Sequence, residues 1–193
     1  MKYLCLLLMS VFSVAGISGV YAENITQDLS DNLLRLHVIA NSNSKEDQEI
    51  KLKIRDQVLK VSDGTCNTEL LNQTVNSALI ELGAEYGGSV RIVRRYVPEK
   101  TYKNIRLPEG IYNCINVVLG SGKGENWWCV AYPPLCFTED VFGELSNDGR
   151  LLLERNLSEE SFRAIVYDGK INIRSRLVDE FIRLKKSYGK NSP

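Results

Sequence analysis

Apolar residues occupy every second position of the chain from Leu34 to Ala40. This period of two predicts a half-buried β-strand. Residues 41–44 interrupt the alternation, and Ser44 followed by Asp47 predicts a helix start with acids in the first turn. Apolar residues then recur every three or four positions as far as Val61. This spacing predicts an amphipathic helix that ends near residues 63–64.

A second amphipathic pattern follows Asn67-Thr68 and stops at Gly87-Gly88, which predicts another helix. Three β-rich runs come next, and the β-branched and aromatic residues in them predict strands at residues 89–97, 110–119 and 127–132. Residues 161–167 fit helix and strand equally, and residues 176–188 predict a closing helix. Together these elements predict an α+β fold: a small antiparallel sheet packed with two N-terminal amphipathic helices and a C-terminal helix.

The first 22 residues have the pattern of an export signal. One basic residue, Lys2, precedes an apolar stretch, and the small residues Val20 and Ala22 form a site suited to signal peptidase before Glu23. An uncleaved membrane anchor is the alternative, because the apolar stretch is near the lower length limit for a spanning helix. We therefore expect a signal peptide or anchor at residues 1–22 and a single exported domain at 23–193. Within that domain, the turn-rich segment 138–160 is expected to be a surface insertion.

Composition narrows the function classes. The chain has 193 residues, 24 Lys and Arg against 24 Asp and Glu, and 44% hydrophobic residues. These values are typical of a globular protein and argue against a disordered chain or a polytopic membrane protein. A balanced charge offers no dense basic face for nucleic acid, so a nucleic-acid partner is not expected.

Export changes the interpretation of the cysteines. Four of the five lie beyond the signal, and Cys129 and Cys136 flank a segment that contains two prolines. The prolines favour a bend, so we predict a disulfide between these two cysteines. Free buried thiols are the alternative. A second pair, Cys66 with Cys114, is a weaker expectation. Zinc is disfavoured because the chain has one histidine and no Cys-x-x-Cys.

Catalytic and cofactor motifs have little support. The glycine-rich run 120–124 lacks both the P-loop spacing and a following helix, so it is interpreted as a turn that positions the tryptophans. His37, the single histidine, is interpreted as a hydrogen-bonded structural residue. Glu125 is a candidate acid, but nothing in the sequence marks a second carboxylate for a glycosidase. We therefore expect no enzyme activity, no cofactor, no metal and no small-molecule substrate.

The most unusual segment is residues 126–137, which holds both tryptophans, two cysteines and a Pro-Pro pair. Core packing explains such aromatics as well as recognition does. A clamped aromatic loop also suits partner binding, because rigid aromatic side chains contribute contact area at low entropic cost. The candidate partner-binding residues are Trp127, Trp128, Pro133, Pro134 and Phe137.

Two long motifs resemble the stage II sporulation protein R family. The first covers residues 34–48 (LRLHVIANSNSKEDQ) and 53–56 (KIRD), and the second covers residues 120–130 (GSGKGENWWCV) and 133–137 (PPLCF). The resemblance extends over residues 30–140 and keeps the order of the motifs.

The resemblance implies a secreted signalling protein of endospore formation. Such proteins are made in the forespore and exported into the space between the forespore and mother-cell membranes. There they are required to activate a membrane-embedded aspartic protease that processes pro-sigma-E, with contact at the membrane surface. The family supplies no catalytic residues. Two other classes stay open: an exported cell-wall or peptide hydrolase that uses Glu125 or His37, and a thiol–disulfide protein that uses Cys129 and Cys136.

Overall fold

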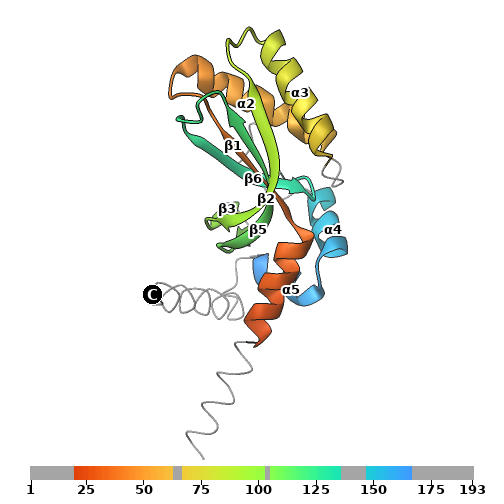
Figure 1. The fold of residues 1–193 in the computed structure, drawn as a ribbon. Coiled ribbons are helices and arrows are strands. Elements are labelled where there is room, and N and C mark those ends of the chain that lie inside the picture. The colour runs from red at the N-terminus through yellow and green to blue at the C-terminus, as the bar shows by residue number, and fades with distance from the viewer. Residues whose placement is uncertain (1–19, 63–66, 103–104, 136–146, 167–193) are drawn as a thin grey trace, which may run out of the picture.

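The computed structural model describes residues 20–62, 67–102, 105–135 and 147–166. A helical segment at residues 20–32 comes first. The other elements are, in order, β1 (Leu34–Ile39), α2 (Lys45–Val61), α3 (Thr68–Glu81), β2 (Gly88–Val97), β3 (Lys100–Tyr102), β4 (Ile105–Leu107), β5 (Gly110–Leu119), β6 (Asn126–Tyr132), α4 (Asn147–Asn156) and α5 (Glu159–Ile165). These elements form an α+β fold, as predicted (Figure 1).

The main sheet is mixed, and the prediction of a purely antiparallel sheet was wrong. Its strand order is β2-β5-β1-β6. The pairs β2–β5 and β1–β6 are antiparallel, whereas β1 and β5 run parallel. A parallel pair needs a long crossover connection. Here the connection consists of α2, α3, β2, β3 and β4, which lie between β1 and β5 along the chain.

One face of the sheet carries α2 and α3. Their apolar stripes pack on side chains of β1, β2, β5 and β6, and Leu36, Val38, Ile54, Val58 and Val75 are fully buried there. Both helices begin where the sequence predicts. The Ser44 hydroxyl accepts the Asp47 N–H, and the Asn67 side-chain oxygen accepts the Leu70 N–H. Each cap satisfies an N–H group that has no partner within its helix.

A second core lies toward the end of the sheet near α4 and the helical segment 20–32, which Figure 1 shows in blue and in orange-red. Segment 20–32 buries Ile25 and Leu29 in this core, and it also buries Ala22, the last residue of the predicted signal peptide. The sequence pattern did not predict this helix. Strands β3 and β4 pair antiparallel, and β4 contributes Ile105 and Leu107 to this core. The sequence pattern predicted neither strand.

The expectation of a surface insertion at 138–160 was wrong for its described part. Residues 147–156 form α4, and Leu153 and Leu157 are buried in the second core. The polar composition of the segment conceals this, because one helical face suffices to bury it. Residues 161–165, whose sequence fits a helix and a strand equally, form part of α5. The predicted C-terminal helix at 176–188 lies outside the described residues.

The second core also buries the face of β1 that the alternation placed toward solvent. Arg35 is fully buried and His37 is 2% exposed. A strand with polar residues at alternate positions ordinarily turns them to water. In this protein both faces of β1 are covered.

Among the described residues, no helix is long and apolar enough to span a membrane.

Candidate functional site

The two motifs that are far apart in sequence form one surface at one end of the sheet. The glycine loop 120–124, which follows β5, packs on residues 41–44, which follow β1. The Ser121 N–H donates to Oδ1 of Asn41 over 2.9 Å, and the Ser121 hydroxyl donates to the backbone carbonyl oxygen of Asn41 over 2.8 Å. The Glu125 N–H donates to Oδ1 of Asn43 over 2.8 Å. We call residues 41–44 and 120–125 the paired loops.

The glycines of the paired loops form the turn that the sequence predicts. Gly120 and Gly122 have φ values of +52° and +61°, a region in which glycine is favoured. Every backbone N–H from Gly120 to Glu125 donates within the protein. A phosphate cradle needs free N–H groups that point at the ligand. The loop offers none, so a nucleotide site is excluded here.

A buried carboxylate holds the first of these loops. Asp47 accepts hydrogen bonds from the Ser42 hydroxyl over 2.5 Å, from Nδ2 of Asn41 over 2.9 Å and from the Tyr86 hydroxyl. The bonds from Ser42 and Tyr86 outweigh burial and lower the pKa of Asp47. Burial, with the Asp47 bond, raises the pKa of Tyr86. The cluster therefore stays as a carboxylate with a neutral phenol, which fixes the start of α2.

His37 lies at the centre of a polar cluster on the face opposite α2 and α3. Its Nδ1 is 2.7 Å from Oδ1 of Asn116, and its Nε2 is 2.6 Å from Oδ1 of Asn126. Nη1 of Arg95 is 2.8 Å from Nδ1 of His37 and donates to Oδ1 of Asn116 over 2.7 Å. The ring stacks on Trp128, with centroids 3.7 Å apart and planes inclined by 8°. This arrangement fits the structural role that the sequence suggests.

Burial lowers the pKa of His37, and the charge of Arg95 acts in the same direction, while the hydrogen bonds to the side-chain oxygens of Asn126 and Asn116 partly offset both. The imidazole is therefore neutral at pH 7. In the described part of the chain the neutral ring contacts two amide side chains, a guanidinium and an indole, which suits positioning of other groups rather than proton transfer.

The lowered pKa of His37 predicts a pH-dependent stability. The unfolded chain binds a proton near the reference pKa of 6.5, whereas the folded chain binds it only at lower pH. The free energy of unfolding should therefore fall as the pH drops from about 6.5 toward the folded pKa, by at most about 1.4 kcal/mol per pH unit. Urea unfolding between pH 7 and 5 measures this slope. In the His37→Gln variant the free energy of unfolding should no longer fall between pH 7 and 5. If it still falls as steeply, another titrating group causes the pH dependence.

The two tryptophans lie on opposite faces of the sheet, because neighbouring residues of a strand point in opposite directions. Trp127 packs against the core under α2 and α3, and the Arg55 guanidinium lies 4.6 Å from its ring centroid. Trp128 packs at the border of the second core beside His37, with the Arg95 guanidinium 5.2 Å from its ring. Both side chains are partly exposed. The predicted binding segment is thus split between two faces.

The remaining predicted binding residues follow β6. Pro133 is buried and Pro134 is exposed, while Phe137 lies outside the described residues. Cys129 is buried and disulfide-bonded. Its predicted partner Cys136 lies outside the described residues, so the 129–136 pairing stays a prediction.

Cys114 is a free, buried thiol, so the expectation that it pairs with Cys66 was wrong. Its side chain lies on the face of β5 that the second core and the polar cluster cover. Burial raises its pKa to about 11, and the charges of Arg95 and Arg35 oppose that shift only in part. A thiol with so high a pKa is unreactive at neutral pH.

Arg35 is the residue of this region that sequence reasoning missed. It is fully buried, its Nε donates to the Cys129 carbonyl oxygen over 3.2 Å, and its guanidinium lies 5.2 Å from the Tyr112 ring. Among the described residues, neither Nη1 nor Nη2 has a hydrogen-bond partner. An arginine keeps its charge in proteins, so its burial is costly without a carboxylate.

We expect the Arg35→Met variant to be more stable than the parent protein, by about 1–3 kcal/mol. Methionine fills much of the same volume without a buried charge. The midpoint of urea unfolding measures the change, and Arg35→Lys, which keeps the charge, should not share the gain. A lower midpoint for Arg35→Met would mean that the contacts with Cys129 and Tyr112 outweigh the cost of burial.

The acidic candidate for hydrolysis is poorly placed for catalysis. Glu125 is exposed at the end of the paired loops, and its carbonyl oxygen accepts a 3.2 Å bond from Nζ of Lys51. Across the described ranges, no group of three or more His, Cys, Asp or Glu side chains is placed to hold a metal ion. The prediction that catalysis is absent stays a prediction.

The fold and the site define a small mixed-sheet α+β protein whose two longest motifs form one hydrogen-bonded surface. The chain belongs to the stage II sporulation protein R family: the family model matches residues 30–141, which include both motifs. Membership gives the chain a role in sporulation. The family is named for a stage of sporulation rather than for an enzyme activity.

The stage II sporulation protein R of Bacillus subtilis (strain 168) is 37% identical to the chain over 139 residues. The aligned part covers 64% of this chain and 62% of the relative, so it spans less than two thirds of either protein. No solved structure matches the chain.

Proposed function

We propose that this protein is an exported signal of endospore formation that activates a membrane protease. In this proposal it is made in the forespore and secreted into the space between the forespore and mother-cell membranes. At the mother-cell membrane surface it activates the aspartic protease that removes the pro-sequence from sigma-E. The family membership and the export pattern at residues 1–22 support this assignment.

The observation that carries the proposal is the way the two family motifs fold. They lie some 80 positions apart, yet the paired loops join them through direct hydrogen bonds. Trp128 of the second motif is partly exposed, and its ring stacks on His37 of the first motif. The groups with catalytic potential are otherwise engaged, because His37 is neutral and bonded and the loop N–H groups are used. A rigid surface of this kind suits recognition, since little ordering entropy is lost on binding.

The test places the full chain, the protease and tagged pro-sigma-E together in cells that do not sporulate. We expect the shorter, processed sigma-E to appear on gels only when all three are present. A variant without residues 1–22 should leave pro-sigma-E uncut, because it stays on the wrong side of the membrane. Processing in the presence of an inactive protease would instead support the hydrolase alternative.

A further inference from the structure

Strand β2 forms one edge of the sheet, and half of that edge is covered by side chains of α3. The Asn72 amide binds both backbone groups of Val90: its oxygen accepts the N–H over 2.8 Å and its nitrogen donates to the carbonyl over 3.1 Å. The Asn76 amide binds Gly88 in the same way: its oxygen accepts the N–H over 3.0 Å and its nitrogen donates to the carbonyl over 3.1 Å. Each asparagine therefore occupies the place that a neighbouring strand would take.

The spacing of residues along α3 and β2 explains why the asparagines cover the edge at Gly88 and Val90 and no further. Four residues of helix rise about 6 Å and two residues of strand about 6.8 Å, so Asn76 and Asn72 match Gly88 and Val90. The next residue in this helical series is Thr68, where α3 begins. It carries no amide that could continue the series.

The remaining part of the edge offers backbone groups to a partner. In an antiparallel pair, outward-facing residues alternate with residues bonded to the neighbour. Because Gly88 and Val90 face outward, Ile92 and Arg94 face outward too. In the part of the chain that the structure describes, no hydrogen bond reaches the outward N–H and carbonyl of these two residues. Such a row is a template for an added strand.

The charge along this edge selects the partner. Arg91 and Arg94 are exposed and Arg95 is partly buried. Arg94 contacts the Ser30 hydroxyl over 3.4 Å, and Arg95 contacts His37 and Asn116. None of the three arginines has a carboxylate partner within the described ranges.

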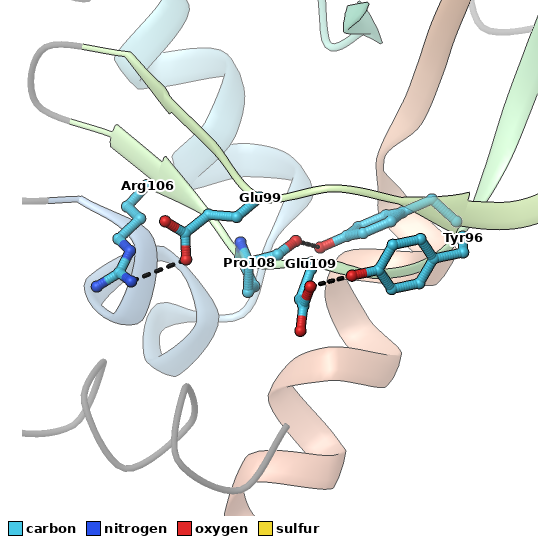
Figure 2. A network of polar contacts seen from close by, with 6 residues as sticks. Tyr96, Glu99, Arg106, Pro108 and Glu109 are labelled. Atoms are coloured by element: carbon cyan, nitrogen blue, oxygen red, sulfur yellow. Dashed lines mark hydrogen bonds and ion pairs between the residues drawn. The ribbon is translucent and has the colours of Figure 1, made fainter. Parts of the chain in front are cut away.

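The acidic residues beyond the end of β2 are already engaged (Figure 2). Glu99 pairs with Arg106 over 2.8 Å, and Glu109 accepts the Tyr96 hydroxyl. Within the described ranges, neither carboxylate pairs with an arginine of β2. A second copy of the chain on this edge would place arginines against arginines, and like charges directly opposite each other are destabilising.

We propose that the open half of the β2 edge, from Ile92 to Arg94, binds an extended acidic segment of a partner protein as an added strand. Backbone hydrogen bonds to Ile92 and Arg94 supply the docking, and Arg91 and Arg94 select acidic side chains. The inference goes beyond the proposed function and does not depend on it, since the edge would bind such a segment whichever signal the protein carries.

The test uses the exported chain and a synthetic peptide of alternating valine and glutamate. Binding should slow amide hydrogen exchange at Ile92 and Arg94, while Gly88 and Val90, already bonded to asparagines, change little. The Arg94→Pro variant removes one outward N–H and leaves the bonds to β5 intact, so it should weaken binding about tenfold or more. Arg94→Ala keeps that N–H and should lose less.

The controls separate the edge from other sites. A peptide with lysine in place of glutamate should not bind, and Arg91→Pro, which breaks a bond to β5, should lower stability instead. Binding without protection at Ile92 and Arg94 would overturn the proposal, as would equal binding by Arg94→Pro. The proposal also fails if the peptide does not bind, since the arginines would then serve only to prevent strand pairing. If the chain instead forms dimers through this edge, the edge binds a second copy and the proposal is wrong.

Discussion

Gly124→Ala should unfold the paired loops and destabilise the protein by about 3 kcal/mol. A Cβ at this position would lie 2.3 Å from the Ser42 carbonyl oxygen and 2.7 Å from both the Ser42 carbonyl carbon and Cβ of Ala40. The obstacle is backbone, which cannot rotate away. It is also tethered, because the Gly124 N–H donates to the Ala40 carbonyl over 2.9 Å and the Lys123 N–H to the Asn41 carbonyl over 3.1 Å. Relieving the clash therefore breaks the bonds that join the two motifs.

Gly83→Ala is the matched control. Gly83 has a φ of +71°, and nothing lies within 4 Å of a Cβ built on it. Alanine there suffers backbone strain alone, about 1–2 kcal/mol. Urea unfolding compares the two variants, and amide exchange at residues 41–43 shows whether the loops separate. Equal losses in both variants would mean that the contact between the loops contributes little.

Local signals explain the parts of the fold that the sequence predicts well. Ser44 and Asn67 cap α2 and α3 as expected, because a cap depends on residues within one turn. The bounds of β5 match the predicted run, since its β-rich composition ends in glycine on both sides. The glycine loop was also interpreted correctly, because Gly120 and Gly122 need positive φ.

Non-local pairing explains the failures. The parallel pairing of β1 with β5 joins Leu34 to Asn113, and no short-range pattern specifies such a partner. For the same reason the stacking of His37 on Trp128 could not be foreseen, although the two residues are direct partners in the β1–β6 ladder. The burial of Arg35 contradicts its place in an alternating strand. Its cover is the second core, to which the missed segment 20–32 and the misjudged α4 contribute.

The two tryptophans are neighbours in the sequence, but they pack against different cores on opposite faces of the sheet. Trp127 is packed on the core beneath α2 and α3 and contacts Arg55. Although part of the ring is exposed, its Nε1 is buried. Truncating a tryptophan packed on a core costs about 3–5 kcal/mol, a large part of the stability of an ordinary domain. Trp127→Ala should therefore be degraded in cells, and its loss of activity should follow its loss of abundance. Trp127→Phe, which keeps a ring in the core, should recover both.

Trp128→Ala should behave in the opposite way. Its ring lies on His37 at the border of the second core and keeps an exposed part. Losing the stack costs about 1–2 kcal/mol, which a folded domain tolerates. In the proposed function this ring is the rigid anchor for the protease, and truncating an anchor of this kind commonly costs about 2 kcal/mol or more of binding. The variant should be abundant and folded, yet fail to trigger pro-sigma-E processing.

Two measurements distinguish these outcomes. Immunoblots report the abundance of each exported variant, and the size of sigma-E reports processing in the same cells. The recognition role predicts normal abundance without processing for Trp128→Ala, with partial recovery in Trp128→Phe, because a smaller flat ring still stacks on His37. If both tryptophan variants disappear by proteolysis, the rings serve the core alone. The protease contact would then have to lie elsewhere, because neither ring would be a binding anchor.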